Sequence, residues 1–348
     1  MKESHTCCFR IGGVRFFCKW FDFDSVLGYN YRVNRNKKGI CGMQQVFSTT
    51  LNQMICFFII MIIGFILCKL KCLNENTDVV ISKLLSTVIM PVLIFQTFVS
   101  KLRVEVLAQK LYIFLIGAVI ATLSYLLARL LAKVFAKDKY LQNIYTYSFA
   151  VSNLGYMGIP LVKAVFGDDV LFDMMVFTVP FHIYIYSIGL ASLNPNHPKV
   201  TLKSFANPVF GGMIFGGIVG LSGITLPSAV LSVTTMISNC MSPLPMIVAG
   251  VVIAKYQIKS LLYDYKIYIA VILRLIVLPL FFVFVIKLLG CNQSILLLAM
   301  CSLAMPMGLN TIVFPSAYGG DTRPGASMAL ISNILGIITI PVMIAMIM

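Results

Sequence analysis

Asparagine, glycine and proline interrupt two long apolar stretches of this chain in a similar way. Residues 152–160 read SNLGYMGIP, and residues 305–315 read MPMGLNTIVFP. An apolar segment that crosses a bilayer must pair its backbone N–H and C=O groups, because each unpaired group there costs about several kcal/mol. Matched breaks in the two halves of a membrane protein therefore indicate the substrate site of a transporter.

The chemistry expected at such breaks is anion binding. A half-helix that begins at mid-membrane presents a positive N-terminus and unpaired N–H donors in a medium that screens them little. Asn153 and Asn310 add neutral amide donors suited to a carboxylate. The alternative is that glycine and asparagine only pack closely spaced helices; the matching of the breaks favours a site. The candidate substrate-binding residues are Asn153, Gly155, Gly158, Pro160, Pro306, Gly308 and Asn310.

Four residues outside the breaks are candidates for the transport pathway. Pro91 and Pro243 kink apolar stretches, as hinges of a gate or as simple determinants of shape. His182 has the chemistry to relay protons or bind substrate, or else it hydrogen-bonds a neighbouring helix. Arg274 either faces a substrate anion or extends to the membrane interface.

The composition is that of a polytopic membrane protein. Of 348 residues, 59% are hydrophobic and 11% are charged, and the mean hydropathy is +0.93. The net charge of +15 comes from basic residues that lie singly or in pairs between apolar runs, so we expect no nucleic-acid partner. The ten cysteines form no CxxC unit, and we expect no metal site.

Signatures of catalysis and of ATP-driven transport are missing. The chain has no GxxxxGK[ST], HExxH or GxSxG motif. No carboxylate lies well inside an expected span, which disfavours proton or sodium coupling. We therefore expect neither an enzyme nor a bound cofactor.

We expect an all-α fold of ten transmembrane helices, because about 20 apolar residues are needed for each crossing. The spans are expected near residues 46–68, 78–100, 111–135, 141–167, 170–193, 205–222, 227–253, 265–289, 293–318 and 324–347. They form two units of five, residues 43–193 and 205–348, joined by a short loop at 194–204. Residues 1–42 are a basic extension without a span, and our hypothesis is that Met43 is the natural start.

A nearly constant offset relates the two units. Adding 153 carries Gly155 to Gly308 and Asp168 to Asp321, and adding 152 carries Pro91 to Pro243. Since five spans is an odd number, the second unit must enter the membrane from the opposite side, as in inverted-repeat transporters. The interrupted helices 4 and 9 would then cross.

Charge supplies an orientation. Connections after odd-numbered spans, with the adjoining span ends, carry twelve Lys or Arg, against four for those after even-numbered spans. By the positive-inside rule the odd connections face the cytoplasm of a plasma-membrane protein, and both termini of the ten-span core lie outside. The basic extension would favour the opposite orientation.

Three motifs carry a family resemblance. IMPVLIFQTF (89–98), SNLGYMGIPLV (152–162) and AMPMGLNTIVFPSAYGGD (304–321), in this order and spacing, resemble the auxin efflux carrier family, which includes plant auxin exporters and bacterial permeases for malate and related carboxylates. The resemblance covers roughly residues 43–348. It implies ten helices in two inverted repeats with crossing interrupted helices 4 and 9, and it matches Asn310 to an asparagine at the second crossover. The short inter-repeat loop is similar to the compact, bacterial-type branch, and the substrate stays open.

We therefore expect a secondary transporter for small organic anions such as carboxylates, which works by alternating access around the crossover. The alternatives are a sodium- or proton-coupled symporter of the bile-acid-transporter type and a membrane sensor that binds an anion without moving it. The expected partners are the anion and the lipid bilayer, with a homodimer as an open oligomeric state.

Overall fold

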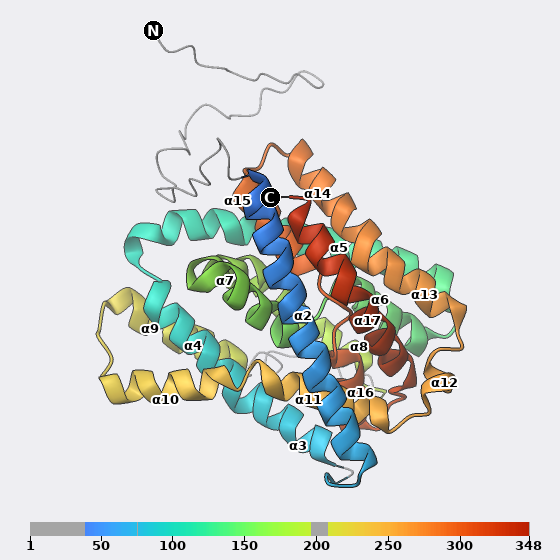
Figure 1. Ribbon diagram of the computed structural model, residues 1–348. Helices are drawn as coiled ribbons and strands as arrows, with labels where there is room; N and C mark the ends of the chain where they lie inside the picture. The colour runs from blue at the N-terminus through green and yellow to red at the C-terminus, as the bar shows by residue number, and fades with distance from the viewer. Residues whose placement is uncertain (1–38, 75, 196–207, 348) are drawn as a thin grey trace.

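The structure is a computed structural model that describes residues 39–74, 76–195 and 208–347 (Figure 1). These residues are helical with short connections and contain no β-strand, which confirms the all-α class for this part of the chain. Residues 1–38 of the basic extension expected at 1–42 lie outside the described residues, whereas residues 39–42 belong to the first helix. Most of the loop expected at 194–204 also lies outside the described residues.

The helices run in a simple order. The first half contains α2 (Gly39–Lys69), α3 (Thr77–Leu84), η1 (Leu85–Ile89), α4 (Met90–Lys101), η2 (Val104–Val106), α5 (Leu107–Phe135), α6 (Lys139–Ala150), η3 (Leu154–Gly158), α7 (Ile159–Tyr184), η4 (Ile185–Gly189) and α8 (Leu190–Leu193). The second half contains α9 (Pro208–Ser222), α10 (Ser228–Asn239), α11 (Pro243–Ala254), α12 (Ile258–Leu261), α13 (Tyr265–Ile272), η6 (Leu273–Val277), α14 (Leu278–Leu288), α15 (Gln293–Leu303), α16 (Asn310–Tyr318) and α17 (Arg323–Ala345).

Seven helical segments of the described chain are long and apolar enough to cross a membrane. α9 and α15 are apolar but shorter. A multi-pass membrane protein is therefore supported by length and composition. The ten crossings in two inverted repeats stay a prediction.

Wide π-helical turns precede three prolines. η1, η3 and η6 each end two residues before a proline, at Pro91, Pro160 and Pro279. Proline lacks an N–H and its ring collides with the carbonyl four residues earlier, so a widened turn lets the helix continue past it. At Pro243 the chain takes another course, because a turn over residues 240–242 separates α10 from α11.

In both interrupted segments the α-helix ends where the sequence predicts a break. α6 ends at Ala150 and η3 begins at Leu154, whereas α15 ends at Leu303 and α16 begins at Asn310. Gly167 adds a further break inside α7, with a φ of 82° that an L-residue with a side chain rarely adopts. The long helical stretch from Leu154 to Leu193 therefore contains two differently directed pieces.

One group of connections meets at one end of the bundle. Lys255 Nζ lies 2.8 Å from Asp78 Oδ1, which links the end of α11 to the start of α3. The Arg323 guanidinium donates to the Ser260 carbonyl oxygen at 3.3 Å, which links α17 to α12. These residues all belong to connections, or adjoining helix ends, that follow odd-numbered expected spans.

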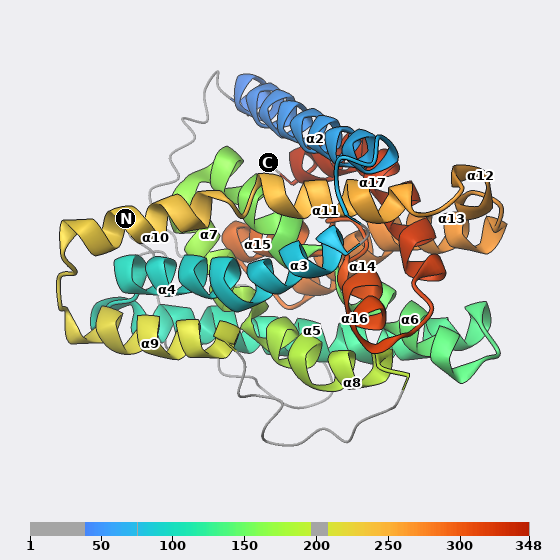
Figure 2. The same cartoon turned by 90° about the horizontal axis from the view of Figure 1, so that it is seen from below.

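The other group meets at a second set of helix ends. Lys101 Nζ lies 2.6 Å from Asp169 Oδ1, and the Arg103 guanidinium donates to the Gly220 carbonyl oxygen at 3.1 Å. These residues border connections after even-numbered expected spans. The start of α2 and the end of α17 lie close together in both views of the bundle (Figures 1 and 2).

Glycines allow two helix pairs to pack closely. α2 lies along α11, and α4 lies along α9 (Figure 2). A Cβ at Gly250 of α11 would lie 1.9 Å from the Met61 carbonyl oxygen, and one at Gly212 of α9 would lie 2.4 Å from the Pro91 carbonyl oxygen. Small residues at such contacts are the usual means by which membrane helices approach each other.

Gly250→Ala should therefore destabilise the protein, by about 1–3 kcal/mol, because α2 backbone atoms must move to admit the methyl group. Gly211→Ala is the matched control, since a Cβ there meets nothing within 4 Å. Thermal unfolding in detergent measures both. Equal melting temperatures for the two variants would contradict the close contact of α2 with α11.

Candidate functional site

Backbone contacts join the two breaks directly. The Asn153 N–H donates to the Pro306 carbonyl oxygen at 2.7 Å, and Ser152 pairs with Met307 in a short antiparallel bridge. The Ser152 hydroxyl donates to the Ser302 carbonyl oxygen at 2.5 Å. Groups freed by one break are thus satisfied by the other, which is how unwound backbone persists inside an apolar bundle.

A small cavity of about 20 Å³ lies at this junction. It is lined by Met90, Ser152, Asn153, Leu154, Gly155, Tyr156, His182, Ile185, Tyr186, Gly308, Leu309 and Asn310. The lining includes the first residues of both η3 and α16, so two helix N-termini reach the same space. A cavity of this size has room for about one water molecule. A carboxylate needs the surrounding helices to move apart.

The two asparagines contribute differently to the cavity. Asn153 is buried, and its Nδ2 has no hydrogen-bond partner within the described residues. Asn310 is half-buried, and its Nδ2 donates to the Tyr147 hydroxyl at 2.8 Å. Because a primary amide has two N–H donors, Asn310 keeps one beyond this bond.

The remaining residues expected in the breaks occupy different places. Gly155 and Gly308 line the cavity, whereas Gly158, Pro160 and Pro306 do not. Gly155 lies against Met90, whose Cε would be 2.9 Å from a Cβ there. Pro306 contributes the carbonyl that Asn153 binds, and Pro160 is buried in the first turn of α7.

His182 lies between this cavity and an apolar pocket. Its Nδ1 is 2.9 Å from the Thr178 carbonyl oxygen, which can only accept, so Nδ1 carries the proton. In the neutral ring Nε2 is then an acceptor, and it is buried without a partner among the described residues. His182 lines both spaces.

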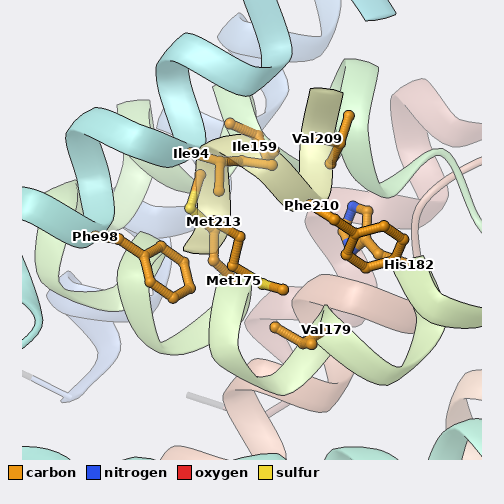
Figure 3. Close-up of a pocket in the computed structure, with 9 residues that line it drawn as sticks. All are labelled: Ile94, Phe98, Ile159, Met175, Val179, His182, Val209, Phe210 and Met213. Atoms are coloured by element: carbon orange, nitrogen blue, oxygen red, sulfur yellow. The ribbon is translucent and has the colours of Figure 1, made fainter. Parts of the chain in front are cut away.

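The apolar pocket also has a volume of about 20 Å³ and lies between α4, α9 and α7 (Figure 3). In this view Phe98 of α4 and His182 of α7 lie at opposite ends of the pocket. Its lining consists of Ile94, Phe98, Ile159, Met175, Val179, His182, Val209, Phe210 and Met213. This apolar pocket adjoins the cavity at His182, which lines both.

A second apolar pocket, of about 10 Å³, is lined by Met54, Phe57, Phe58, Met61, Met157, Met246 and Asn333. Four of these residues correspond to residues of the first apolar pocket at offsets of 151 to 153. The pairs are Phe57 with Phe210, Met61 with Met213, Ile94 with Met246, and His182 with Asn333. This offset agrees with the one that relates the two breaks in the sequence.

The three other candidate pathway residues lie outside the cavity lining. Arg274 is 1% exposed, and its Nη1 donates to the Leu303 carbonyl oxygen, the last residue of α15, at 2.6 Å. Pro91 lies in the first turn of α4 and contacts Gly212. Pro243 begins α11.

Sequence reasoning missed several side chains of the site. Tyr147 reaches the second break from α6, and Tyr156 and Tyr186 line the cavity. A tyrosine in the middle of an apolar span carries a hydroxyl that needs a hydrogen-bond partner, so the sequence alone could have indicated these three residues. Ser152 stands within the quoted motif, but the partner of its hydroxyl depends on the tertiary fold.

Ser152→Cys combined with Met307→Cys should give a disulfide, because residues paired in an antiparallel bridge have Cα atoms about 4.5–5.5 Å apart, within disulfide range. The test uses a cysteine-free background and a protease site inserted between residues 196 and 207. After oxidation and cleavage, the two halves should stay linked until reduced. The single-cysteine variants are the controls, and separation of the oxidised double variant would contradict the junction.

Comparison with known proteins gives the family of this chain. A family model described as membrane transport protein matches residues 49–199 and 196–344. The uncharacterized transporter YfdV of Escherichia coli (strain K12) is 21% identical over 202 residues, and the same holds for YfdV of Shigella flexneri. Each alignment covers 55% of this chain and 63% of the relative. The chain spans less than two thirds of the length of these curated relatives.

The family model covers most of the chain, including both breaks and the residues that join them. The motifs around these breaks are those that resemble the auxin efflux carriers. The chain therefore belongs to the membrane transport protein family, the family of the auxin efflux carriers.

Proposed function

We propose that this protein is a secondary transporter for small organic anions such as carboxylates. The cargo binds where the two interrupted helices cross, and access alternates between the two sides of the membrane. The observation that carries the proposal is the cavity at the joined breaks, which two helix N-termini and the unpaired Asn153 amide line together. Positive helix ends and amide donors are the groups that bind a carboxylate.

The arrangement of helices supports a moving bundle around this site. α2, α4, α9 and α11 form the two close pairs, while α6, α7, α15 and α16 carry the breaks. The first apolar pocket lies between α4, α9 and α7, and the second lies between α2, α11, η3 and α17. We infer that the paired helices act as a scaffold and that the helices with the breaks rock against it, in two inverted repeats of residues 43–193 and 205–348.

We also propose a plasma-membrane location with odd-numbered connections in the cytoplasm and the core termini outside. The separation of the two groups of connecting contacts supports alternating crossings. The excess of basic residues on the odd connections supplies the direction.

Cysteines at Lys137 and Lys259, both exposed, should resist an impermeant thiol reagent in intact cells of a cysteine-free background. A cysteine at the exposed Glu105, in an even connection, should be labelled. Permeabilisation should make all three reactive. Labelling of the first two from outside, with Glu105 protected, would reverse the orientation.

Asn153→Ala should weaken carboxylate binding by about 1–3 kcal/mol, the usual value for a hydrogen bond to a charged group. Asn153→Asp should weaken it further, because a nearly isosteric side chain then places negative charge where the anion binds. The same order is expected at Asn310. Purified protein in liposomes, tested with mono- and dicarboxylates, provides both affinity and flux.

The control variant is Asn292→Asp, which adds the same charge at the start of α15 and can keep the cap to the Ile295 N–H. It should leave affinity unchanged. If both crossover Asp variants transport every tested carboxylate with wild-type affinity, the anion site lies elsewhere. Binding without flux in the wild-type protein would indicate a sensor.

A further inference from the structure

Arg274 carries a buried positive charge near the second break, although it does not line the cavity. It lies on the wide turn η6, between α13 and α14, and is 1% exposed. Its Nη1 bonds the Leu303 carbonyl oxygen at 2.6 Å, while Nε and Nη2 are buried without partners among the described residues. A guanidinium stays protonated in proteins, and burying one in a membrane is costly.

The repeat relation supplies a comparison for this contact. In the first unit, the Ser124 hydroxyl of α5 donates to the Ala150 carbonyl oxygen, the last residue of α6, at 3.1 Å. Ala150 and Leu303 are 153 positions apart, and Ser124 and Arg274 are 150 apart. The two side chains thus perform the same task, satisfying the terminal carbonyl of a half-helix that ends at a break.

The charge of Arg274 is more than the capping of a carbonyl requires. A neutral hydroxyl is sufficient for Ala150, so capping alone does not require a charge at Leu303. The ion pairs within the described residues involve Lys101, Lys110, Lys163 and Lys255. In that part of the chain Arg274 has no carboxylate partner, and its charge is compensated only by the negative end of α15.

We propose that Arg274 is the fixed counter-charge of the anion bound at the crossover, acting through space from behind the second break. Leu303 lies shortly before Gly308 and Asn310, which line the cavity. In an apolar surrounding a unit charge acts over many ångströms. The inference rests on the proposed function. It makes Arg274 a positioning residue that determines how strongly the site prefers a dicarboxylate to a monocarboxylate.

This arrangement has an advantage for transport. A direct ion pair at the cavity would bind cargo through short, charge-assisted bonds that slow its release. A charge held one layer behind neutral amides and backbone N–H groups attracts the anion without such bonds. Binding is then strong enough to select anions and weak enough to be reversible.

The decisive measurement compares cargo of different charge on purified protein, with butyrate and succinate as four-carbon mono- and dicarboxylate probes. Arg274→Gln should weaken butyrate about tenfold, the effect of losing a unit charge roughly 10 Å away at an effective dielectric constant of about 20. Because the electrostatic energy is proportional to the ligand charge, succinate should weaken by about the square of that factor. Arg274→Lys should retain most of the affinity for both.

Two further variants separate charge from structure. Ser124→Ala removes the corresponding capping bond without changing charge, so it should lower thermal stability and leave the ratio of the two affinities unchanged. The exchange Ser124→Arg with Arg274→Ser moves the charge to the corresponding place behind the first break. This exchange variant should restore the affinity that Arg274→Gln loses. If Arg274→Gln does not fold, the affinity of the exchange variant tests whether the charge is needed.

The outcomes are distinct. If Arg274→Gln weakens the binding of butyrate and of succinate by equal factors, the role of Arg274 is purely structural. The same holds if the exchange variant folds but does not bind them. Either result would overturn the inference while leaving the anion site intact. Failure of the wild-type protein to bind any carboxylate would instead refute the proposed function, and this inference with it.

Discussion

The fold depends on the need to pair backbone groups where two helices are interrupted inside an apolar bundle. Each break releases N–H and C=O groups that apolar side chains and lipid cannot satisfy. The bond from the Asn153 N–H to the Pro306 carbonyl, and the pairing of Ser152 with Met307, let each break satisfy the other. Neither break is tolerable alone, so the two halves of the chain must assemble together.

The surroundings of the breaks follow from this constraint. The chain end before each break has carbonyls to satisfy, and Ser124 and Arg274 bond one of them on each side. The chain end after each break is a helix N-terminus, and both N-termini reach one cavity. Two positive helix ends thus meet in one place, while a terminal carbonyl on each side is bonded by a side chain, an arrangement that favours an anion at the junction.

Much of this arrangement could be predicted from local sequence. Gly, Asn and Pro within apolar runs locate the breaks because these residues disturb a helix by known local mechanisms. The partners of Tyr147 and Arg274 could not be predicted, because they lie on helices distant in sequence. The wide turn before Pro91 was expected only as a kink, since local chemistry does not decide between a bend and an inserted residue.

The small volume of the crossover cavity has a consequence for affinity. The conformation described here has room for about one water molecule there, so a carboxylate bound as proposed requires a more open member of the ensemble. The measured dissociation constant then equals the intrinsic constant divided by the fraction of open molecules. Substitutions far from the cargo, at the glycine contacts between α4 and α9 for example, can therefore change the apparent affinity solely by changing that fraction.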